Sequence, residues 1–193
     1  LDRKGGDLAD VASVASFFVS RIDSLVDSLV DQRLKKEKDP VRRLALDALR
    51  GRVAVANAKL AYQHYQKLLA GKRWKKLAAK GARPQRLLWA STSVKNPAYR
   101  DVLYVEELIG PDTVNTMPEA TFVAFRDHGI VRRCLDENVE AAHDVMGALE
   151  GLGLSMREIT DQLQRDAVRL FVEPFDKLLA AIAAQCEAVP RRA

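Results

Sequence analysis

The stretch SVASFFVSRIDSLVDSLV, residues 13–30, changes its hydrophobic period partway along, and this change decides the fold. Its first half is small, aromatic and β-branched, so residues 12–20 are predicted to form a short buried strand. In the second half the apolar residues recur at the spacing of one helix face. They are Ile22, Leu25, Val26, Leu29, Val30 and Leu34. The stretch therefore predicts a strand that leads directly into a helix, with Arg21 at the junction.

Arg21 stands at the end of an apolar strand, where a cation calls for an explanation because burying an unpaired charge is costly. Two interpretations stay open: the side chain extends into water, or it binds an anion. Three carboxylates follow on the predicted helix at steps of four residues, namely Asp23, Asp27 and Asp31. We interpret them as a solvent-exposed face, because charged residues opposite an apolar stripe normally face water.

The rest of the sequence predicts two more strands among many helices. Asp39 and Pro40 are favoured at a helix start, and they predict a long helix that reaches about Ala70. Further predicted elements are a short basic helix before Gly81, a second buried strand near residues 87–91, a helix over residues 101–109, a third strand near residues 112–117 and a helix from Pro118 to about Gly129. The C-terminal helices span residues 131–187, with a kink or break expected at Pro174.

Three short apolar strands, each followed by helix, indicate right-handed β–α–β crossovers and a parallel sheet. A three-stranded sheet is too small for this number of helices, and a (β/α)8 barrel takes about 250 residues. We therefore predict an α/β fold in which residues 1–193 form the C-terminal part of a single TIM barrel domain. Residues 1–10 lack an initiator methionine and read like an internal loop, so we expect the chain to begin partway through a longer protein.

Composition narrows the classes of partner. A net charge of +5 mildly favours anionic ligands, but the most basic stretch, residues 71–86, contains one tryptophan and no series of aromatic residues for base stacking. We therefore expect no nucleic-acid partner. No apolar run approaches the roughly 18 residues that a membrane span needs, so no membrane partner is expected. Two distant cysteines without a signal peptide fit reduced thiols in a cytoplasmic protein.

Metal-ligating and nucleophilic side chains do not assemble into a convincing centre. Glu140 and His143 form half of a di-iron motif whose second copy is missing, and His64 and His128 have no ligand spacing with either cysteine. A Cys134–His143 dyad would need an orienting partner. We interpret these as ordinary helix and surface residues, and we predict no metal ion.

Polar residues gather where each predicted strand ends, and β/α barrels bind their ligands at the carboxyl ends of the strands. The residues at the three ends are Ser20 and Arg21, then Ser91, Thr92, Ser93 and Lys95, then Asn115 and Thr116. Two cations and several hydroxyls suit a phosphate, since a guanidinium can bind two of its oxygens while neutral donors bind the others. This pattern gives the anion-binding interpretation of Arg21 equal weight with that of a surface arginine.

Four segments resemble transaldolase in the long form typical of actinobacteria and cyanobacteria: ASFFVSRID (residues 15–23), LLWASTSVKNPAY (87–99), YVEELIGPDTVNTMPEATFVAFRDHG (104–129) and VEPFDKLLAAI (172–182). The resemblance implies a class I aldolase-type barrel of the pentose phosphate pathway, in which the three predicted strands are the sixth, seventh and eighth. Such enzymes transfer a dihydroxyacetone unit from sedoheptulose 7-phosphate to glyceraldehyde 3-phosphate through a lysine Schiff base, without a cofactor.

The resemblance also implies roles for five residues. The family's sixth-strand pattern falls on Ser16, Phe18 and Arg21. Ser16 would hydrogen-bond near the reacting carbons, Phe18 would form a wall of the site, and Arg21 would hold the substrate phosphate. On the seventh strand, Ser91 matches a serine that assists the phosphate. Lys95 is the candidate replacement for an arginine that relatives with a shorter loop carry there.

The family's catalytic residues are expected outside this chain. The resemblance implies a Schiff-base lysine on the fourth strand and acid–base carboxylates on the first and third, all upstream of Leu1. None of Lys59, Lys67 and Lys95 matches that lysine, so no catalytic residue is assigned here. We expect the chain to be inactive alone, and its partners to be a sugar phosphate and the N-terminal half of the same barrel.

Two other functions compete with this one. A truncated, non-enzymatic helical interaction module would form a homo-oligomer, because a partial barrel leaves sheet edges and apolar faces uncovered. A basic nucleic-acid binder would lose affinity steeply as salt is added. Light scattering and salt titration separate these two from a sugar-phosphate enzyme.

Overall fold

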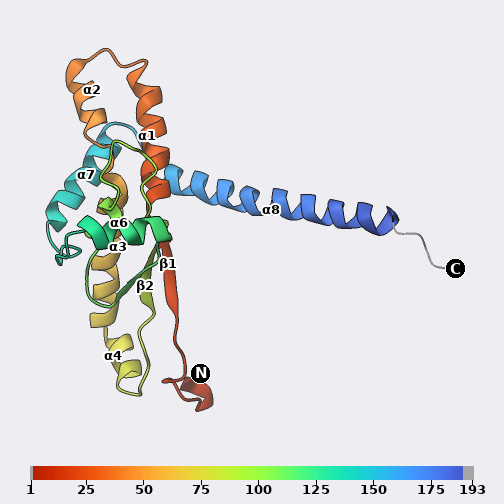
Figure 1. The fold of residues 1–193 in the computed structure, drawn as a ribbon. Helices are drawn as coiled ribbons and strands as arrows, with labels where there is room; N and C mark the ends of the chain where they lie inside the picture. Colours follow the sequence, from red (N-terminus) through yellow and green to blue (C-terminus); the bar gives the residue numbers. More distant parts are fainter. Residues whose placement is uncertain (1, 189–193) are drawn as a thin grey trace. The chain divides into compact units, whose positions relative to one another are not determined.

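The computed structural model describes residues 2–188, and it contains a parallel sheet among many helices (Figure 1). The chain divides into two compact units; the first ends at Ser155 and the second begins at Met156. All three strands belong to the first unit, so the candidate site does too. Within residues 2–188, no helix combines the length and the apolar character that crossing a membrane requires.

The sheet consists of β1 (Val14–Phe18), β2 (Arg86–Ala90) and β3 (Thr113–Asn115) in that spatial order. Both pairings are parallel, and Ser16 of β1 lies opposite Leu88 of β2. The three parallel strands that the sequence predicts are therefore present. Because each strand is followed by helix, the arrangement is consistent with part of a β/α barrel.

The first strand is much more exposed than predicted. Val14 and Phe18 on β1 are 41% and 48% exposed, whereas Trp89 on the central strand β2 is only 1% exposed. The prediction of a buried strand over residues 12–20 is wrong for β1, because β1 lies at the edge of the sheet and pairs on one side only in the described part of the chain.

Four helices lie between β1 and β2, and a short 3-10 turn precedes β1. Their bounds are η1 (Asp2–Lys4), α1 (Ser20–Leu34), α2 (Pro40–Asp47), α3 (Val53–Ala70) and α4 (Lys72–Ala78). Asp39 caps α2 as predicted, since its carboxylate accepts a hydrogen bond from the Val41 N–H at 3.0 Å. This cap satisfies one of the donors left free at the helix start.

The single long helix predicted from Pro40 to about Ala70 is wrong, because the chain turns between α2 and α3. Gly51 stands in this turn with φ +66°, a conformation that favours glycine. A Cβ on Gly51 would lie 3.1 Å from the ring of Tyr99. The turn therefore fits around a side chain that comes from the segment after β2.

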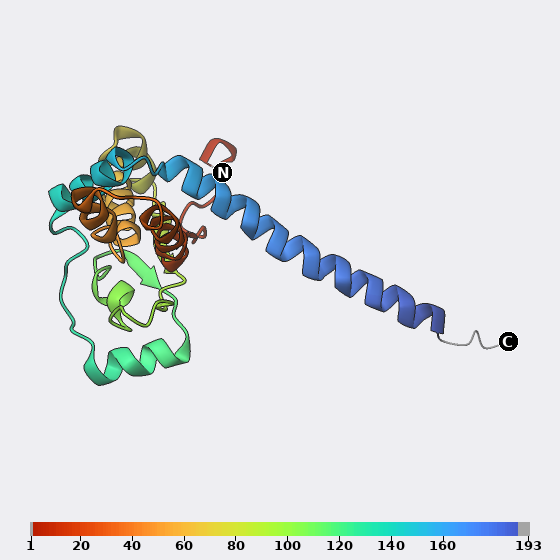
Figure 2. The same cartoon turned by 90° about the horizontal axis from the view of Figure 1, so that it is seen from above.

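Three further helices complete the first unit: α5 (Leu103–Glu106), α6 (Glu119–His128) and α7 (Val139–Gly151). The helix predicted over residues 101–109 forms only one turn, as α5. Figure 2 shows α6 to one side of α1 and α3, joined to the rest of the unit by extended segments. Most of its large apolar side chains are accordingly exposed or half-buried.

The C-terminal helical region predicted from residue 131 begins only at Val139. The backbone N–H groups of Cys134 and Leu135 both donate to the carbonyl of Ile109, at 3.1 Å each. These bonds hold the segment against the end of the α5 region and replace the hydrogen bonds of a helix. The prediction of helix over residues 131–138 is therefore wrong.

The core of the first unit forms where α3 packs against α7 and α1. The buried residues of these three helices include Val26, Val30, Val53, Ala54, Ala58, Val145 and Leu149. Alanines on α3 let the neighbouring helices approach closely, which is the usual use of small residues at a helix contact.

The second unit is one helix, α8 (Met156–Ala188), which continues through Pro174. Of the kink or break predicted at Pro174, the break is therefore wrong, although proline still removes one hydrogen bond from a helix. Exposed apolar residues recur along α8 at steps of three and four: Val168, Phe171, Phe175, Leu178 and Ile182. They form a continuous apolar stripe on one face of the helix.

Candidate functional site

The end of β1 presents an arginine whose charge is not neutralised. Arg21 lies in the first turn of α1, is exposed, and has no carboxylate partner among residues 2–188. Its Cζ atom lies 4.6 Å from the centroid of the Phe18 ring. This cation–π contact holds the guanidinium close to the end of the strand and leaves its N–H groups free. Arg21 can therefore bind an anion without first breaking an ion pair.

Ser16 and Phe18 lie on the same face of β1, since side chains two residues apart point to the same side of a strand. Both are exposed. They lie on the strand directly before Arg21, which comes from the helix start. The structure thus brings the three residues of the sixth-strand pattern into one region, although only the contact between Phe18 and Arg21 is direct.

The end of β2 is joined to the end of β1 by serine hydroxyls. Ser20 Oγ lies 2.9 Å from Ser91 Oγ, and the Ser20 N–H donates to the Ser91 carbonyl at 3.0 Å. Ser91 adopts a left-handed backbone conformation with φ 56°, which is uncommon for serine. The hydrogen bonds of the sheet therefore continue past β1, and the chain turns sharply at Ser91.

The end of β3 is held by a buried threonine. Thr92 is fully buried, and its Oγ1 lies 2.8 Å from Asn115 Oδ1 and 3.1 Å from the Thr116 carbonyl. The Thr116 N–H in turn donates to the Trp89 carbonyl at 2.9 Å. These bonds join the ends of β2 and β3, so hydrogen bonds connect all three strand ends.

The loop after β2, residues 91–100, carries Lys95. Its Nζ donates to Ser93 Oγ at 2.8 Å, and the side chain is exposed. The ammonium has further N–H donors, so it can reach an anion from the loop. The structure thus places Lys95 in the loop that continues from Ser91, and it gives Lys95 no bond to Arg21.

Asp27 of α1 anchors this loop. The Tyr99 hydroxyl lies 2.7 Å and 2.8 Å from the two carboxylate oxygens of Asp27, and Asn96 Nδ2 donates to Asp27 at 3.2 Å. Burial, followed by the nearby carboxylate, raises the pKa of Tyr99. Tyr99 therefore stays protonated and donates, which ties the loop to the helix that starts with Ser20 and Arg21.

A second anchor lies at the end of the loop. Arg100 donates to both carboxylate oxygens of Glu106, at 2.7 Å and 2.9 Å, and Glu106 also accepts from the Ile130 N–H at 2.8 Å. The Arg100 guanidinium holds the pKa of Glu106 below its usual range. The bonds of Ser91 and Thr92 hold the start of loop 91–100, and those of Tyr99 and Arg100 hold its end, while Lys95 stays exposed.

One carboxylate predicted to face solvent is buried in the first turn of α1. Asp23 of α1 is 1% exposed; its Oδ1 accepts from the Ala54 N–H at 2.8 Å, and its Oδ2 accepts from the Tyr104 hydroxyl at 2.9 Å. Burial raises the pKa of Asp23 to about 6. Because α1 is covered here by α3 and by α5, the predicted solvent-exposed face is wrong for Asp23.

Of the other two carboxylates on the predicted solvent-exposed face, one is half-buried and one is exposed. Asp27 is half-buried and bonded as described above, so the prediction is wrong for it as well. Asp31 is exposed as predicted and pairs with Arg50 at 2.5 Å. The sequence did contain a signal for Asp23, because it follows Ile22 and precedes Val26 at positions close to the apolar stripe.

The parallel strands alternate with helices, and serines, a threonine and two cations follow their carboxyl ends. This arrangement is consistent with part of a protein of the β/α barrel class. Comparison with known proteins makes this class specific. Residues 6–182 match the family described as Transaldolase/Fructose-6-phosphate aldolase. The chain therefore belongs to this family.

Individual relatives agree with this assignment. The chain is 49% identical over 181 residues to "Transaldolase" of Trichodesmium erythraeum (strain IMS101), which covers 93% of the chain and 48% of the relative. It is 50% identical over 182 residues to "Transaldolase" of Parafrankia sp. (strain EAN1pec), covering 94% of the chain and 47% of the relative. The chain thus spans about half the length of the curated relatives that it matches. The resemblance found in the sequence is confirmed.

Proposed function

We propose that this chain supplies the phosphate-binding side of a transaldolase. The complete enzyme would transfer a dihydroxyacetone unit from sedoheptulose 7-phosphate to glyceraldehyde 3-phosphate in the pentose phosphate pathway, in the cytoplasm. The observation that carries the proposal is the exposed guanidinium of Arg21, which lies over Phe18 at the end of β1 without a carboxylate partner among residues 2–188. A phosphate is the ligand that this arrangement suits best.

Each of the five site residues has a role in this proposal. Arg21 binds two phosphate oxygens, Ser91 donates to a third, and Lys95 adds a second positive charge from its loop. Ser16 donates toward the carbons that react, and Phe18 forms an apolar wall that also positions Arg21. Because the phosphate is distant from the reacting carbon, its binding energy serves to orient the sugar for the chemistry.

The chemistry itself requires groups from the other half of a class I aldolase-type barrel. A lysine amine there would attack the ketose carbonyl, form a C=N bond and release water. The cationic imine accepts the electron pair of the adjacent C–C bond as that bond breaks, and carboxylates move the protons. We assign no residue of this chain to these steps, and the chain alone is expected to be inactive.

The exposed edge of the sheet supports a second half as partner. β1 pairs only with β2 in the described chain, and its exposed face carries Val14, Ser16 and Phe18. In a complete barrel this edge would pair with the preceding strand, which would remove it from water. On this proposal β1, β2 and β3 are the sixth, seventh and eighth strands of one barrel.

Substitution of Arg21 in the complete protein tests the assigned role. Arg21→Gln removes the charge while keeping a side chain of similar length, so we expect the KM for sugar phosphates to rise about 10- to 100-fold, as expected for loss of a charge-assisted hydrogen-bond pair. The KM of Arg21→Lys should lie between that of the parent enzyme and that of Arg21→Gln. Arg73→Gln, an exposed arginine of α4, is the matched control. An unchanged KM in Arg21→Gln would exclude this role.

The alternative function, a helical interaction module, draws its support from α8. Its apolar stripe from Val168 to Ile182 is exposed along its whole length in the described chain. Such a stripe would favour a homo-oligomer if no other part of the protein covered it. Light scattering on the 193-residue chain separates the two: stable dimers favour the module, and a monomer that becomes active with the other half favours the enzyme.

A further inference from the structure

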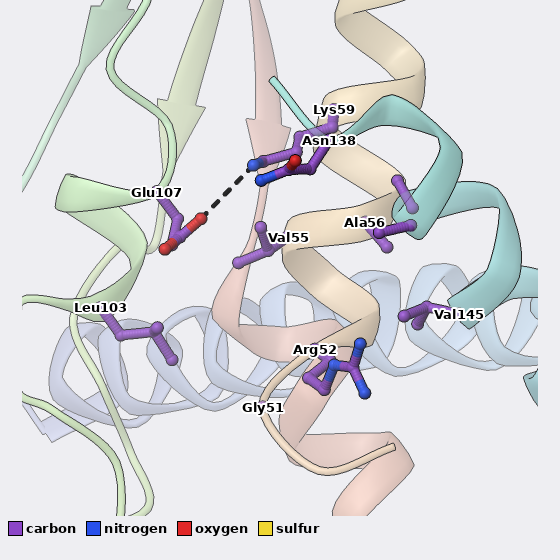
Figure 3. Close-up of a pocket in the computed structure, with 11 residues that line it drawn as sticks. Gly51, Arg52, Val55, Ala56, Lys59, Leu103, Glu107, Asn138 and Val145 are labelled. Carbon is purple, nitrogen blue, oxygen red and sulfur yellow. Dashed lines mark ion pairs between the residues drawn. The ribbon is translucent and has the colours of Figure 1, made fainter. Parts of the chain in front are cut away.

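A pocket of about 270 Å³ opens in the first unit between α3, α5 and α7 (Figure 3). None of its lining residues belongs to the candidate phosphate site. Its floor is apolar, with Val55 from α3, Leu103 from α5 and Val145 from α7. Its lining also includes four polar side chains, Arg52, Lys59, Glu107 and Asn138, so it suits a small molecule that has both polar and apolar parts.

Two of these polar groups, Arg52 and Lys59, stand at the two ends of one helix face. Arg52 is the N-cap residue of α3, and Val55 and Lys59 follow it at steps of three and four residues, so the three lie on the same side of the helix. Seven residues of helix separate the Cα atoms of Arg52 and Lys59 by about 10 Å. A ligand that reaches both ends therefore needs a short chain of carbons between two polar groups.

At one end, a lysine is buried with weak partners. Lys59 is only 6% exposed, and its Nζ lies 3.4 Å from Glu107 Oε2 and 3.4 Å from the Glu137 carbonyl. Figure 3 shows its side chain extended toward Glu107. Both distances exceed those of a good hydrogen bond, and an ammonium has three N–H donors. Lys59 can therefore donate to an uncharged ligand oxygen, since Glu107 already balances its charge.

At the other end, an arginine has no charge partner. Arg52 is exposed; its Nη1 donates a long hydrogen bond of 3.5 Å to the Ala48 carbonyl, and it forms no ion pair with the described residues. Since Lys59 and Glu107 cancel, Arg52 gives the pocket an excess of one positive charge. An anionic group of single charge suits this end.

We propose that this pocket binds a short organic monocarboxylate, about five carbons long, with a carbonyl or hydroxyl oxygen near its far end. The carboxylate pairs with the Arg52 guanidinium, the carbons contact Val55, Leu103 and Val145, and the far oxygen accepts from Lys59. Binding here is separate from the phosphate site, and it does not depend on the proposed transaldolase activity.

The test is a titration of the 193-residue chain with 4-oxopentanoate, followed by NMR of its labelled methyl groups. The methyl signals of Val55, Leu103 and Val145 should shift and saturate together. Arg52→Gln should raise the dissociation constant at least 10-fold, whereas Arg73→Gln should leave it unchanged. Ala141→Leu should also weaken binding, because Ala141 lines the pocket and is exposed, so the larger side chain narrows the mouth without changing the core.

Two further ligands separate this proposal from simple charge attraction. Pentanoate has the same carboxylate and chain length without the oxo group, so it should bind more weakly. Inorganic phosphate should not produce the same saturating shifts. The proposal is overturned if the shifts lie outside the pocket, if Arg52→Gln binds like the parent chain, or if phosphate binds as tightly as 4-oxopentanoate.

Discussion

At the scale of single residues, Asp23 shows how much depends on one buried group. Its carboxylate accepts hydrogen bonds from α3, through the Ala54 N–H, and from the Tyr104 hydroxyl. It thereby joins the helix after β1 to two elements that lie far away in the sequence. The burial that makes these bonds strong also opposes the ionised form of the carboxyl.

Asp23 predicts a pH dependence of stability. Its pKa is about 6 in the folded chain against 3.8 for an unperturbed aspartate, so between these values the folded chain binds more protons than the unfolded one. The contribution of Asp23 to the free energy of unfolding therefore falls as pH rises from about 4 to 6, by up to about 3 kcal/mol. Asp23→Asn should lack this fall, because asparagine has no charge to bury.

Urea unfolding of both chains at several pH values between 4 and 7 measures this difference. Asp144→Asn, an exposed residue of α7, serves as the control and should follow the parent chain. Parallel pH profiles for Asp23→Asn and the parent chain would contradict the assignment of a raised pKa to Asp23.

At the scale of elements, the candidate site depends on how loop 91–100 is attached to α1. The Tyr99 hydroxyl bonds to Asp27, and the Tyr99 ring packs against Gly51 in the turn between α2 and α3. One tyrosine thus connects a loop, a helix and a turn. Its hydroxyl and its ring can be tested separately.

Tyr99→Phe keeps the ring against Gly51 and removes only the bond to Asp27. We expect the amide hydrogens of residues 93–100 to exchange several-fold faster, because the loop opens more often once this anchor is lost. Exchange within α3 should not change. Hydrogen exchange read by mass spectrometry measures both segments. If the loop exchanged equally fast in Tyr99→Phe and in the parent chain, the bond between Tyr99 and Asp27 would not anchor the loop.

Gly51→Ala tests the turn. With φ +66° and a Tyr99 ring atom 3.1 Å from the new Cβ, alanine should lower the free energy of unfolding by about 1–2 kcal/mol. Gly147, exposed in α7, has nothing within 4 Å of a Cβ. Gly147→Ala should therefore raise the free energy of unfolding by about 0.5–1 kcal/mol. Chemical denaturation measures the free energy of unfolding of both variants. Equal changes in Gly51→Ala and Gly147→Ala would contradict the strained turn at Gly51.

The elements show what local pattern can and cannot predict. The change of period after residue 20 predicted β1 and α1, and the parallel arrangement predicted that polar residues would meet at the strand ends. The end of α2 at Asp47 and the start of α7 at Val139 were not predicted, because contacts with distant residues cause them: Tyr99 with Gly51, and the Ile109 carbonyl with residues 134 and 135. The burial of Asp23 depends in the same way on a tyrosine 81 residues away.

At the scale of the whole molecule, the chain spans about half the length of its family relatives, and its three parallel strands are consistent with part of a barrel. One edge of its sheet is β1, whose exposed face carries two of the residues proposed to contact the substrate, Ser16 and Phe18. The central claim is that Arg21 binds the phosphate of a sugar substrate in the complete enzyme. This role concerns recognition of the phosphate and not the bond that breaks.

The most direct test compares phosphorylated and unphosphorylated substrate in the complete protein. The ratio of kcat/KM for fructose 6-phosphate to kcat/KM for fructose measures how much the phosphate contributes. We expect Arg21→Gln to lower this ratio about 10- to 100-fold, through the phosphorylated substrate alone. A ratio equal to that of the parent enzyme, or an equal loss for both sugars, would contradict the proposed role of Arg21.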